Sequence, residues 1–249
     1  MLATLKEKLL KYINSKGYRI DKIITPKKFK EGSSTKIEFF GVSGVGKSFL
    51  YNKVCEQLSS KNQFIFENEM ELYKNIDNYR SIDLINKSYD LLRKILFEYS
   101  FEIENYYDRL GFLSFSQRML KKEESIKTIN KKAYILIEEG VFHFPNVLKK
   151  LFEEKKEYYS QVVDNTVLIY CYTTAENIIK RKNKRIEEKQ RSYLDLGNKN
   201  HINKQLLDYQ IFLNVLESES PNLKILRVDT SLDVNTNVKK ILDFLRNYK

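Results

Sequence analysis

The sequence has little cysteine, with two residues among 249. Cys55 and Cys171 both fall in apolar segments that are expected to lie in a core, and they lack the spacing of metal ligands. A chain of this length buries a sufficient core without disulfides or a structural metal. The scarcity of cysteine therefore excludes a disulfide-stabilised secreted scaffold and favours a reducing, cytoplasmic compartment.

Long apolar runs are also missing. Residues 1–8 lack the apolar stretch of a signal peptide, and no later segment approaches the length of a membrane-spanning helix. Secretion and membrane insertion are therefore not expected. Residues 1–13 form an amphipathic stretch that also carries lysines, which we expect to pack on its own domain. Weak association of this stretch with the surface of an anionic membrane is the alternative.

Acidic residues are outnumbered, with 33 Asp and Glu against 44 Lys and Arg, which gives a formal net charge of +11. Excess positive charge is typical of nucleic-acid binding. However, the sequence has no recognised nucleic-acid module, and its lysines are scattered among Asn, Ile, Tyr and Phe. We therefore expect a solvated basic surface that attracts anionic small substrates, with nucleic-acid binding as the disfavoured alternative.

A glycine-rich octet is the most specific pattern in the chain. It fits G-x-x-x-x-G-K-[ST] at every specified position and consists of Gly41, Val42, Ser43, Gly44, Val45, Gly46, Lys47 and Ser48. Its glycines let backbone N–H groups curl around a pyrophosphate, at the positive end of a following helix. Lys47 would then reach the β- and γ-phosphates, and the Ser48 hydroxyl would ligate Mg²⁺. The octet therefore predicts a nucleoside triphosphate as ligand.

The segments around the octet support this prediction. Residues 36–40 are rich in β-branched and aromatic side chains, as a buried strand should be. Leu50, Val54 and Leu58 recur at helical spacing after the octet. The order strand, loop, helix is the one that phosphate binding requires, whereas a glycine-rich turn without a ligand is the alternative.

Strand patterns alternate with helical patterns along the rest of the chain. The strands are expected at residues 36–40, 63–67, 133–138, 166–172 and 223–228. Such alternation predicts an α/β fold with a five-stranded parallel sheet that is covered by helices on both faces. We expect an N-terminal helical leader and linker at residues 1–35, followed by this domain at residues 36–249.

About 65 residues with helical periodicity separate the second strand from the third, which is too long for a plain crossover. We expect a helical acceptor region at about residues 72–131. It is dense in aromatic residues, namely Tyr99, Phe101, Tyr106, Tyr107, Phe112 and Phe115. Each of them either fills the core of the insertion, which we favour, or lines a pocket for an acceptor.

A phosphate loop needs carboxylates nearby, because Mg²⁺ has to be held and an attacking hydroxyl has to be oriented. Glu138 and Glu139 end the third strand, and we favour Glu139 as the metal ligand because it lies just past the apolar run. Glu67 and Glu69 follow the second strand, where one of them would engage the acceptor hydroxyl unless the segment is a solvated turn. Asp229, at the end of the last strand, indicates a nucleotide-base loop or a helix cap.

Cationic side chains follow the fourth strand. Thr173 and Glu176 have the spacing of a capping box, which predicts a helix start. Arg181 and Arg185 then share one face of that helix. Most charge runs are solvated, but this one follows the fourth strand of a phosphate-loop domain, so we expect a lid at about residues 174–199. Its arginines would stabilise the charge on a transferring phosphoryl group.

Together these residues resemble the P-loop kinases of the nucleoside and nucleotide kinase type, a group that includes thymidylate kinase. The resemblance covers most of residues 36–248 and rests on the octet, the carboxylates after the second and third strands, the lid segment and residues 228–231. It implies a five-stranded parallel sheet, ATP as donor, Mg²⁺, and a lid whose arginines close over the phosphates. It also implies a helical acceptor region between the second and third strands.

The sequence thus predicts an ATP- and Mg²⁺-dependent phosphotransferase that moves the γ-phosphate to a small acceptor. The acceptor is either a nucleoside or nucleotide or a sugar-like alcohol, because residues 140–143 replace the acidic-Arg-Ser or Asp-Arg motif of the family. A regulatory nucleotide-binding switch is one alternative, although residues 86–89 match the guanine-reading Asn-Lys-x-Asp pattern only in part. A nucleic-acid-directed ATPase or polynucleotide kinase is the other alternative, and it rests on charge alone.

Overall fold

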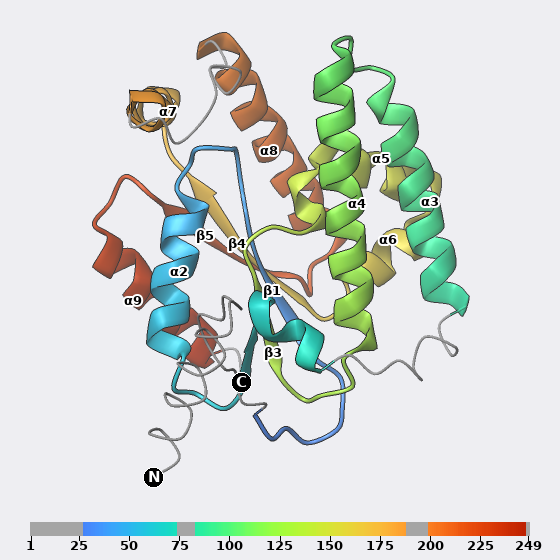
Figure 1. The fold of residues 1–249 in the computed structure, drawn as a ribbon, viewed down its shortest axis with the longest axis vertical. Helices are drawn as coiled ribbons and strands as arrows, with labels where there is room; N and C mark the ends of the chain where they lie inside the picture. Colours follow the sequence, from blue (N-terminus) through green and yellow to red (C-terminus); the bar gives the residue numbers. More distant parts are fainter. Residues whose placement is uncertain (1–26, 74–82, 188–198, 248–249) are drawn as a thin grey trace, which may run out of the picture.

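The computed structural model describes residues 27–73, 83–187 and 199–247. Within them, five parallel strands form one sheet in the order β2-β3-β1-β4-β5 (Figure 1). The strands are β1 (Thr35–Phe40), β2 (Phe64–Phe66), β3 (Tyr134–Ile137), β4 (Thr166–Tyr172) and β5 (Lys224–Asp229). The predicted α/β fold is confirmed, and each strand lies within about one residue of its predicted bounds. The amphipathic stretch at residues 1–13 lies outside the described residues.

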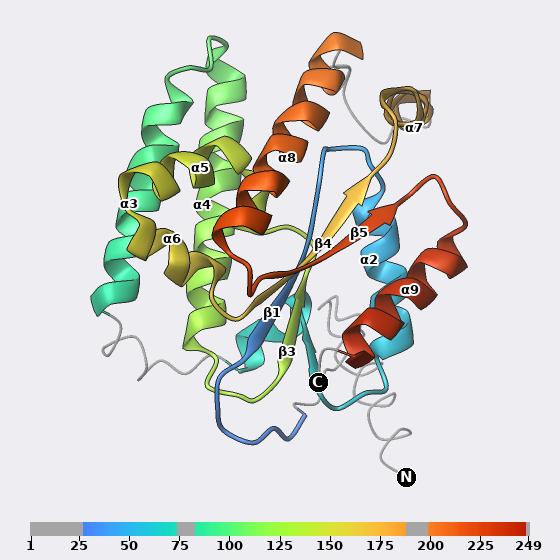
Figure 2. The ribbon, with the colours of Figure 1, turned by 180° about the vertical axis from the view of Figure 1, so that it is seen from behind.

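Helices cover both faces of the sheet. One face carries α2 (Lys47–Leu58) and α9 (Val234–Asn247) (Figure 1). The other face carries α3 (Asp83–Ser100), α4 (Tyr106–Thr128), α5 (Pro145–Glu154), α6 (Lys156–Val163) and α8 (Lys199–Glu219) (Figure 2). Helix α7 (Ala175–Glu187) follows β4 beyond the carboxyl end of the sheet. In the described ranges, no helix combines the length and the apolar character that crossing a membrane requires.

Strand β1 shows how the sequence assigns side chains to the two faces. Ile37 and Phe39 are fully buried against the side of α2 and α9. Phe40 packs on the opposite side, in the core that α4 and α8 cover. Because successive side chains of a strand alternate between faces, Lys36 and Glu38 share the side of Phe40. The strand therefore buries two charged residues beside Phe40. Each of its fully buried apolar side chains contributes about 1.5 to 3 kcal/mol to the stability of the protein.

The residues between β2 and β3 form a short 3-10 helix, η1 (Glu67–Leu72), and the helices α3 and α4. The predicted helical insertion is thus confirmed in its described part, which excludes residues 74–82. Asn105 caps α4, because its side-chain oxygen accepts hydrogen bonds from the backbone N–H groups of Tyr107 at 2.9 Å and Asp108 at 3.1 Å. Within the insertion, α4 packs on the sheet through Met119 and Ile126, and α3 packs on α4 and α5.

The predicted lid helix after β4 is α7, whereas residues 188–198 of the predicted lid lie outside the described residues. The helix begins one residue later than the capping-box pattern suggested. The Thr174 hydroxyl, rather than that of Thr173, accepts a hydrogen bond from the backbone N–H of Asn177, at 3.3 Å. Helix α8, which was not predicted from the sequence, buries Phe212, Leu213 and Leu216 beside α5.

Strand β5 forms one edge of the sheet, since it pairs only with β4. Lys224 and Arg227 on this strand are exposed. The Nζ atom of Lys240 in α9 donates a hydrogen bond to the carbonyl oxygen of Arg227, at 2.8 Å. The Lys240 side chain thus occupies one hydrogen-bonding group on the outer edge of β5, and the charged side chains of Lys224 and Arg227 flank this edge.

Candidate active site

The phosphate-binding loop connects β1 to α2 at the carboxyl end of the sheet (Figure 1). Gly41, Gly44 and Gly46 have φ angles of +139°, +88° and +103°, which L-amino acids rarely adopt. A Cβ atom at Gly41 would also lie 2.2 Å from the carbonyl oxygen of Cys171 in β4. The loop therefore needs these glycines, and its amides curve around the N-terminus of α2, where a polyphosphate binds well.

Lys47, the first residue of α2, has a side chain that is only 4 % exposed. Its Nζ atom donates hydrogen bonds to the carbonyl oxygens of Gly41 at 2.8 Å and Val42 at 3.3 Å. The same atom lies 3.4 Å from Glu139 Oε1. Burial lowers the pKa of Lys47, and the Glu139 carboxylate opposes this effect. The ammonium group thus lies on the inner side of the loop, beside one carboxylate.

The two carboxylates after β3 have different partners. Ser48 Oγ donates a hydrogen bond to Glu138 Oε1, whereas Glu139 pairs with Lys47. The sequence favoured Glu139 as the metal ligand, but Glu138 is the carboxylate that lies beside the hydroxyl of the loop. A hydroxyl oxygen and a carboxylate oxygen side by side are donors that Mg²⁺ prefers, so this pair fits that ion.

Glu67 reaches the same place from η1. Its Oε2 atom accepts a hydrogen bond from the backbone N–H of Glu138 at 3.0 Å, and its Oε1 atom lies 2.7 Å from Lys122 Nζ. Lys122, on α4, also donates a hydrogen bond to the carbonyl oxygen of Glu139, at 2.6 Å. The ends of β2 and β3 and one turn of α4 therefore bring three carboxylates and one lysine together.

Two other predicted site residues have local partners instead. Glu69 Oε2 lies 3.2 Å from Lys27 Nζ, in the turn after β2, and Glu69 lines none of the cavities described below. Asp229 Oδ1 accepts hydrogen bonds from the backbone N–H of Ser231 at 2.8 Å and from Ser231 Oγ at 2.7 Å. Asp229 therefore shapes the turn between β5 and α9 but does not cap the helix, because the backbone N–H of Thr236 in the first turn of α9 donates instead to Asp233 Oδ2, at 3.0 Å.

A polar cavity of about 460 Å³ lies over the carboxylates after β3. Its lining combines the phosphate loop, η1, α4 and the segment after β3: Ser43, Glu67, Phe115, Arg118, Met119, Lys122, Glu138, Glu139 and His143. Acidic and basic groups thus face the same space, directly beside the phosphate loop. Such a cavity can both orient a hydroxyl group and accept its proton.

A second cavity, of about 440 Å³, adjoins Val42 and Ser43 of the phosphate loop and extends between α4 and α8. Its aromatic lining consists of Tyr99, Phe112, Phe115, Phe144 and Tyr209. Its polar lining from α8 consists of His201, Lys204, Gln205 and Asp208. Three aromatic residues of the predicted acceptor region therefore line a cavity as well as packing against the core. The other three are exposed at the surface, namely Phe101, Tyr106 and Tyr107.

His143 lines both of these cavities, as Ser43 and Phe115 also do. Its ring contacts Phe115 with a centroid separation of 5.1 Å and Phe144 with one of 5.8 Å. Its Nδ1 atom lies 3.9 Å from Glu139 Oε1. Burial, together with the nearby Lys47, lowers the pKa of His143 to about 4, against the opposing effect of Glu139. The imidazole is therefore neutral at physiological pH.

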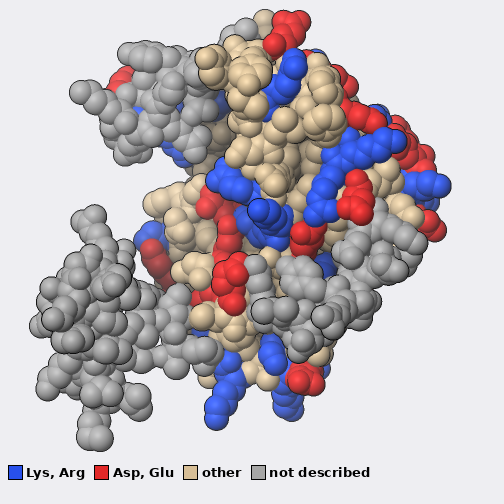
Figure 3. Space-filling view, turned by 45° about the vertical axis from the view of Figure 1, so that its right-hand side comes forward, with Lys and Arg blue, Asp and Glu red and all other residues tan. Residues whose placement is uncertain are grey.

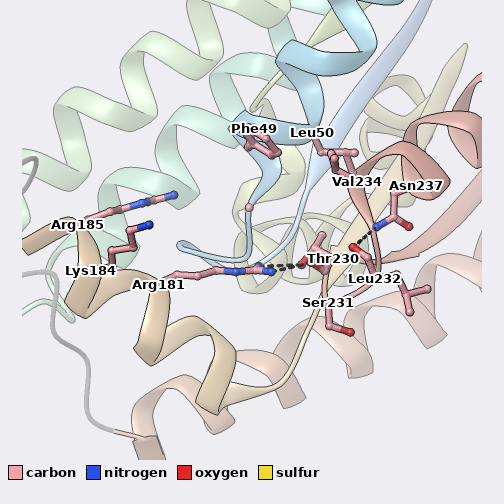
Figure 4. Close-up of a pocket in the computed structure, with 11 residues that line it drawn as sticks. Phe49, Leu50, Arg181, Lys184, Arg185, Thr230, Ser231, Leu232, Val234 and Asn237 are labelled. Carbon is pink, nitrogen blue, oxygen red and sulfur yellow. Dashed lines mark hydrogen bonds between the residues drawn. The ribbon is translucent and has the colours of Figure 1, made fainter. Parts of the chain in front are cut away.

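A third cavity, of about 520 Å³, lies on the other side of the phosphate loop (Figure 4). Arg181, Lys184 and Arg185 line it from one side of α7, and Phe49 lines it from α2. Its remaining lining comes from the loop (Gly46), from α2 (Leu50), from the turn between β5 and α9 (Thr230, Ser231 and Leu232) and from α9 (Val234 and Asn237). Three cations and several apolar groups suit a ligand with a flat ring and a negative charge.

Positive charge is not gathered into a continuous surface on the face that Figure 3 presents, where basic and acidic side chains lie side by side. Ion pairs also join exposed side chains of opposite charge on the surface of the molecule. Lys150 Nζ lies 3.0 Å from Glu98 Oε2, and Lys156 Nζ lies 3.0 Å from Glu219 Oε2. Such pairs add little stability, but they break up the basic surface that a nucleic-acid backbone would need.

The strand order, the glycine conformations and the position of Lys47 define a P-loop NTPase fold. No protein-family model matches this chain, and none of the curated proteins matches it. Among solved structures, the deoxyadenosine kinase from M. mycoides with bound dCTP is 17% identical with a TM-score of 0.47, over 85% of this chain and 99% of that chain. The chain is also similar to a shikimate kinase from Acinetobacter baumannii in complex with shikimate, at 15% identity and a TM-score of 0.40, over 86% of this chain and 94% of that chain.

A gluconokinase from Sinorhizobium meliloti 1021 is likewise similar, at 16% identity and a TM-score of 0.38, over 89% of this chain and 95% of that chain. All three of these proteins are kinases of small molecules by name. The activity of the present chain is therefore inferred from its own residues.

Several residues of the site were missed by the sequence analysis. Lys122 belongs to a run of charges on α4 that looks like a solvated helix face, so no local signal marks it. His143 was noted only as a departure from a family motif. It is one of two histidines in the chain and follows a strand end, and that position was a signal for a role in the site.

Proposed function

We propose that this protein is an ATP- and Mg²⁺-dependent phosphotransferase that moves the γ-phosphate of ATP to a hydroxyl group of a small acceptor. The observation that carries the proposal is that the phosphate loop lines cavities on both of its sides. Gly46 lines the cationic cavity beside α7, and Ser43 lines both cavities beside α4. Transfer between two small molecules needs donor and acceptor to meet in this way at one phosphate site.

On the donor side, the loop amides and Lys47 bind the β- and γ-phosphates, and the cavity beside α7 takes the ribose and the base. Ser48 and Glu138 are the residues that would hold Mg²⁺, which neutralises charge on the phosphates when it is bound. Arg181 and Arg185 stabilise the charge of the transferring group as α7 closes. Closure also excludes water, so that transfer is favoured over hydrolysis.

On the acceptor side, Glu67 is the favoured base, because it lines the polar cavity and its carboxylate is held by the amide of Glu138. The acceptor oxygen forms a bond to the γ-phosphorus while the bond from that phosphorus to the β–γ bridging oxygen breaks. ADP leaves, and the hydroxyl proton passes to Glu67. Lys122 holds the other oxygen of the same carboxylate and so fixes its orientation. Glu69, which pairs with Lys27, has no role in this scheme.

The favoured acceptor is a nucleoside. A flat base can stack on the aromatic wall formed by residues such as Phe112 and Phe115, while the polar groups of α8 meet its edge. A sugar-like alcohol offers a smaller apolar face and no planar π-system, so it gains less from such a wall. A nucleotide acceptor, as in a thymidylate kinase-like enzyme, would need a cation for its phosphate, and Arg118 is the candidate in the polar cavity.

A screen of acceptors tests the proposal. The purified protein is mixed with ATP, Mg²⁺ and one nucleoside, nucleoside monophosphate, sugar or polyol, and ADP release is measured above the background without acceptor. A nucleoside should raise ADP release, and mass spectrometry should detect the phosphorylated product. The proposal is wrong if no acceptor raises ADP release and calorimetry detects no binding of ATP or GTP in magnesium buffer.

A further inference from the structure

Three charged side chains are buried together between β1 and α4. Lys36 is 4 % exposed, and Glu38 and Glu123 are fully buried. Lys36 Nζ lies 2.7 Å from Glu123 Oε1 and 3.1 Å from Glu38 Oε2. Two carboxylates thus share one lysine in the interior, where desolvation makes each charge costly. Apolar side chains would join the helix to the sheet at a lower cost in free energy. We therefore expect these charged side chains to have a specific function.

The cluster binds the backbone that follows β3. Glu38 Oε1 accepts hydrogen bonds from the N–H groups of Gly140 at 3.0 Å and Phe142 at 2.9 Å. Glu123 Oε1 accepts a hydrogen bond from the N–H of Val141, at 3.4 Å. Three consecutive amides therefore point into two carboxylates, an arrangement that apolar replacements could not satisfy.

Gly140 shows how tightly this turn is held. Its φ angle of −137° is open to any residue, so the backbone alone does not require glycine. A Cβ atom at this position would instead lie 2.4 Å from Glu38 Oε2 and 2.7 Å from Glu123 Oε1. Glycine is needed because both carboxylates approach the backbone closely. The turn is therefore positioned by the buried charges.

The turn lies between the reacting groups of the site. Glu138 and Glu139, which contact Ser48 and Lys47, directly precede Gly140, and His143 directly follows Phe142. We propose that Lys36, Glu38 and Glu123 are positioning residues for phosphoryl transfer, which hold the Gly140–Phe142 turn so that Glu138 meets the phosphate loop. This inference rests on the proposed function. It adds a set of charged groups, buried between β1 and α4, that act only through Glu138, Glu139 and His143.

Glu38→Leu and Glu38→Gln form a matched pair for the test, because glutamine keeps an oxygen for the two amides and leucine does not. Leu245→Ala is the control, since it opens a cavity in α9, on the opposite face of the sheet. For each variant we would measure backbone hydrogen exchange over residues 136–144, kcat, the half-saturating Mg²⁺ concentration and the Kd for ATP in EDTA. A merely structural role would alter exchange across the whole protein and would leave the Mg²⁺ requirement unchanged.

In Glu38→Leu we expect exchange over residues 136–144 to rise by at least about tenfold, kcat to fall by a similar factor and the Mg²⁺ requirement to increase, because Glu138 is no longer held. The Kd for ATP in EDTA should stay within about twofold, since the loop amides are untouched. Glu38→Gln should recover most of kcat, whereas Leu245→Ala should raise exchange no more over residues 136–144 than elsewhere and should leave kcat and the Mg²⁺ requirement unchanged. A folded Glu38→Leu variant with wild-type exchange, kcat and Mg²⁺ requirement would overturn the inference.

Two further outcomes remain decisive. If Glu38→Leu does not fold, Glu123→Gln takes its place. The inference would then be overturned if this variant had the Mg²⁺ requirement and the hydrogen exchange of the wild type. If the wild-type protein transfers phosphate to no acceptor, the proposed function fails by itself. In that case the ratio of the Kd for ATP in EDTA to the Kd for ATP with Mg²⁺ is measured in place of kcat. If Glu38→Leu loses this effect of Mg²⁺ and also shows faster exchange over residues 136–144, positioning by the cluster is still supported.

Discussion

Arg181 of α7 donates a hydrogen bond to the backbone carbonyl oxygen of Val45, within the phosphate loop. The same guanidinium donates to Thr230 Oγ1 at 3.0 Å and to the carbonyl oxygen of Thr230 at 2.6 Å. Figure 4 shows these contacts to Thr230 at the edge of the cationic cavity. One side chain thus joins α7, the phosphate loop and the turn after β5. Helix α7 and the phosphate loop are therefore mechanically coupled.

Arg181→Ala is expected to reduce kcat by about 100-fold, because it removes a cation from the phosphate site and releases α7 from the loop. Steady-state kinetics with saturating ATP and acceptor would measure the effect. Arg227→Ala is the matched control, since Arg227 pairs with Glu217 on the surface and lines none of the three cavities. Equal losses of kcat in the two variants would argue against a role of Arg181 in transfer.

Lys47→Ala should abolish transfer, with a loss of at least about 1000-fold in kcat, because its ammonium group lies on the inner side of the loop, where the phosphates are proposed to bind. The fold should persist, since the sheet and the helices do not depend on this ammonium group. Activity assays combined with circular dichroism would check both parts. A variant that turns over at the wild-type rate would contradict the assignment of the octet.

Gly140→Ala should destabilise the protein by about 1 to 3 kcal/mol, because the added Cβ atom overlaps the carboxylates of Glu38 and Glu123. The matched control is Gly111→Ala in α4, where a Cβ atom meets nothing within 4 Å. That change should stabilise the helix by about 1 kcal/mol. Urea unfolding of both variants gives the two free energies of unfolding. Equal changes in the free energy of unfolding at the two positions would show that the turn after β3 accommodates a Cβ atom at position 140.

The stability of the protein should depend on pH through His143. Its pKa is about 4 in the folded protein and near 6.5 in an unfolded chain, so the unfolded state binds more protons between these values. The free energy of unfolding should therefore fall as the pH drops from about 6.5 to about 4, by up to ~3 kcal/mol. The contribution of the lowered His143 pKa to the free energy of unfolding is fully present above pH 6.5.

Comparison with His143→Gln isolates this effect, because the other titrating groups are common to both proteins. Urea unfolding at several pH values between 4 and 7 should give a difference in free energy that shrinks toward acid pH. A difference that stays constant over this range would show that the imidazole is as easily protonated in the folded state as in the unfolded state.

The strands and the phosphate loop could be predicted because their signals are local. Residues 166–172 are an almost continuous apolar run, residues 36–40 are rich in β-branched and aromatic side chains, and the octet specifies both its glycines and its lysine. The partners of Glu138 and Glu139 could not be predicted, since adjacent strand residues point to opposite sides and small differences in twist decide which one meets Ser48. The thymidylate kinase-like subtype and the boundary at residue 35 stay predictions.

Other parts of the site depend on contacts between distant segments. Helix α8 follows a long polar stretch and supplies His201 and Asp208 to a cavity that α4 completes, so its role was invisible in the sequence. Glu38 did leave a signal, because a glutamate within an otherwise buried strand must have partners. The identity of those partners, Lys36 and Glu123, depends on how α4 packs across the sheet.

The outer edge of β5 affects whether the protein aggregates at high concentration. A strand from a second molecule could extend the sheet there only by displacing Lys240 from the Arg227 carbonyl oxygen and by crowding further positive charge beside Lys224. Both steps oppose fibrillar growth from this border. Calorimetry and unfolding experiments at high protein concentration should therefore not be limited by ordered aggregation along β5.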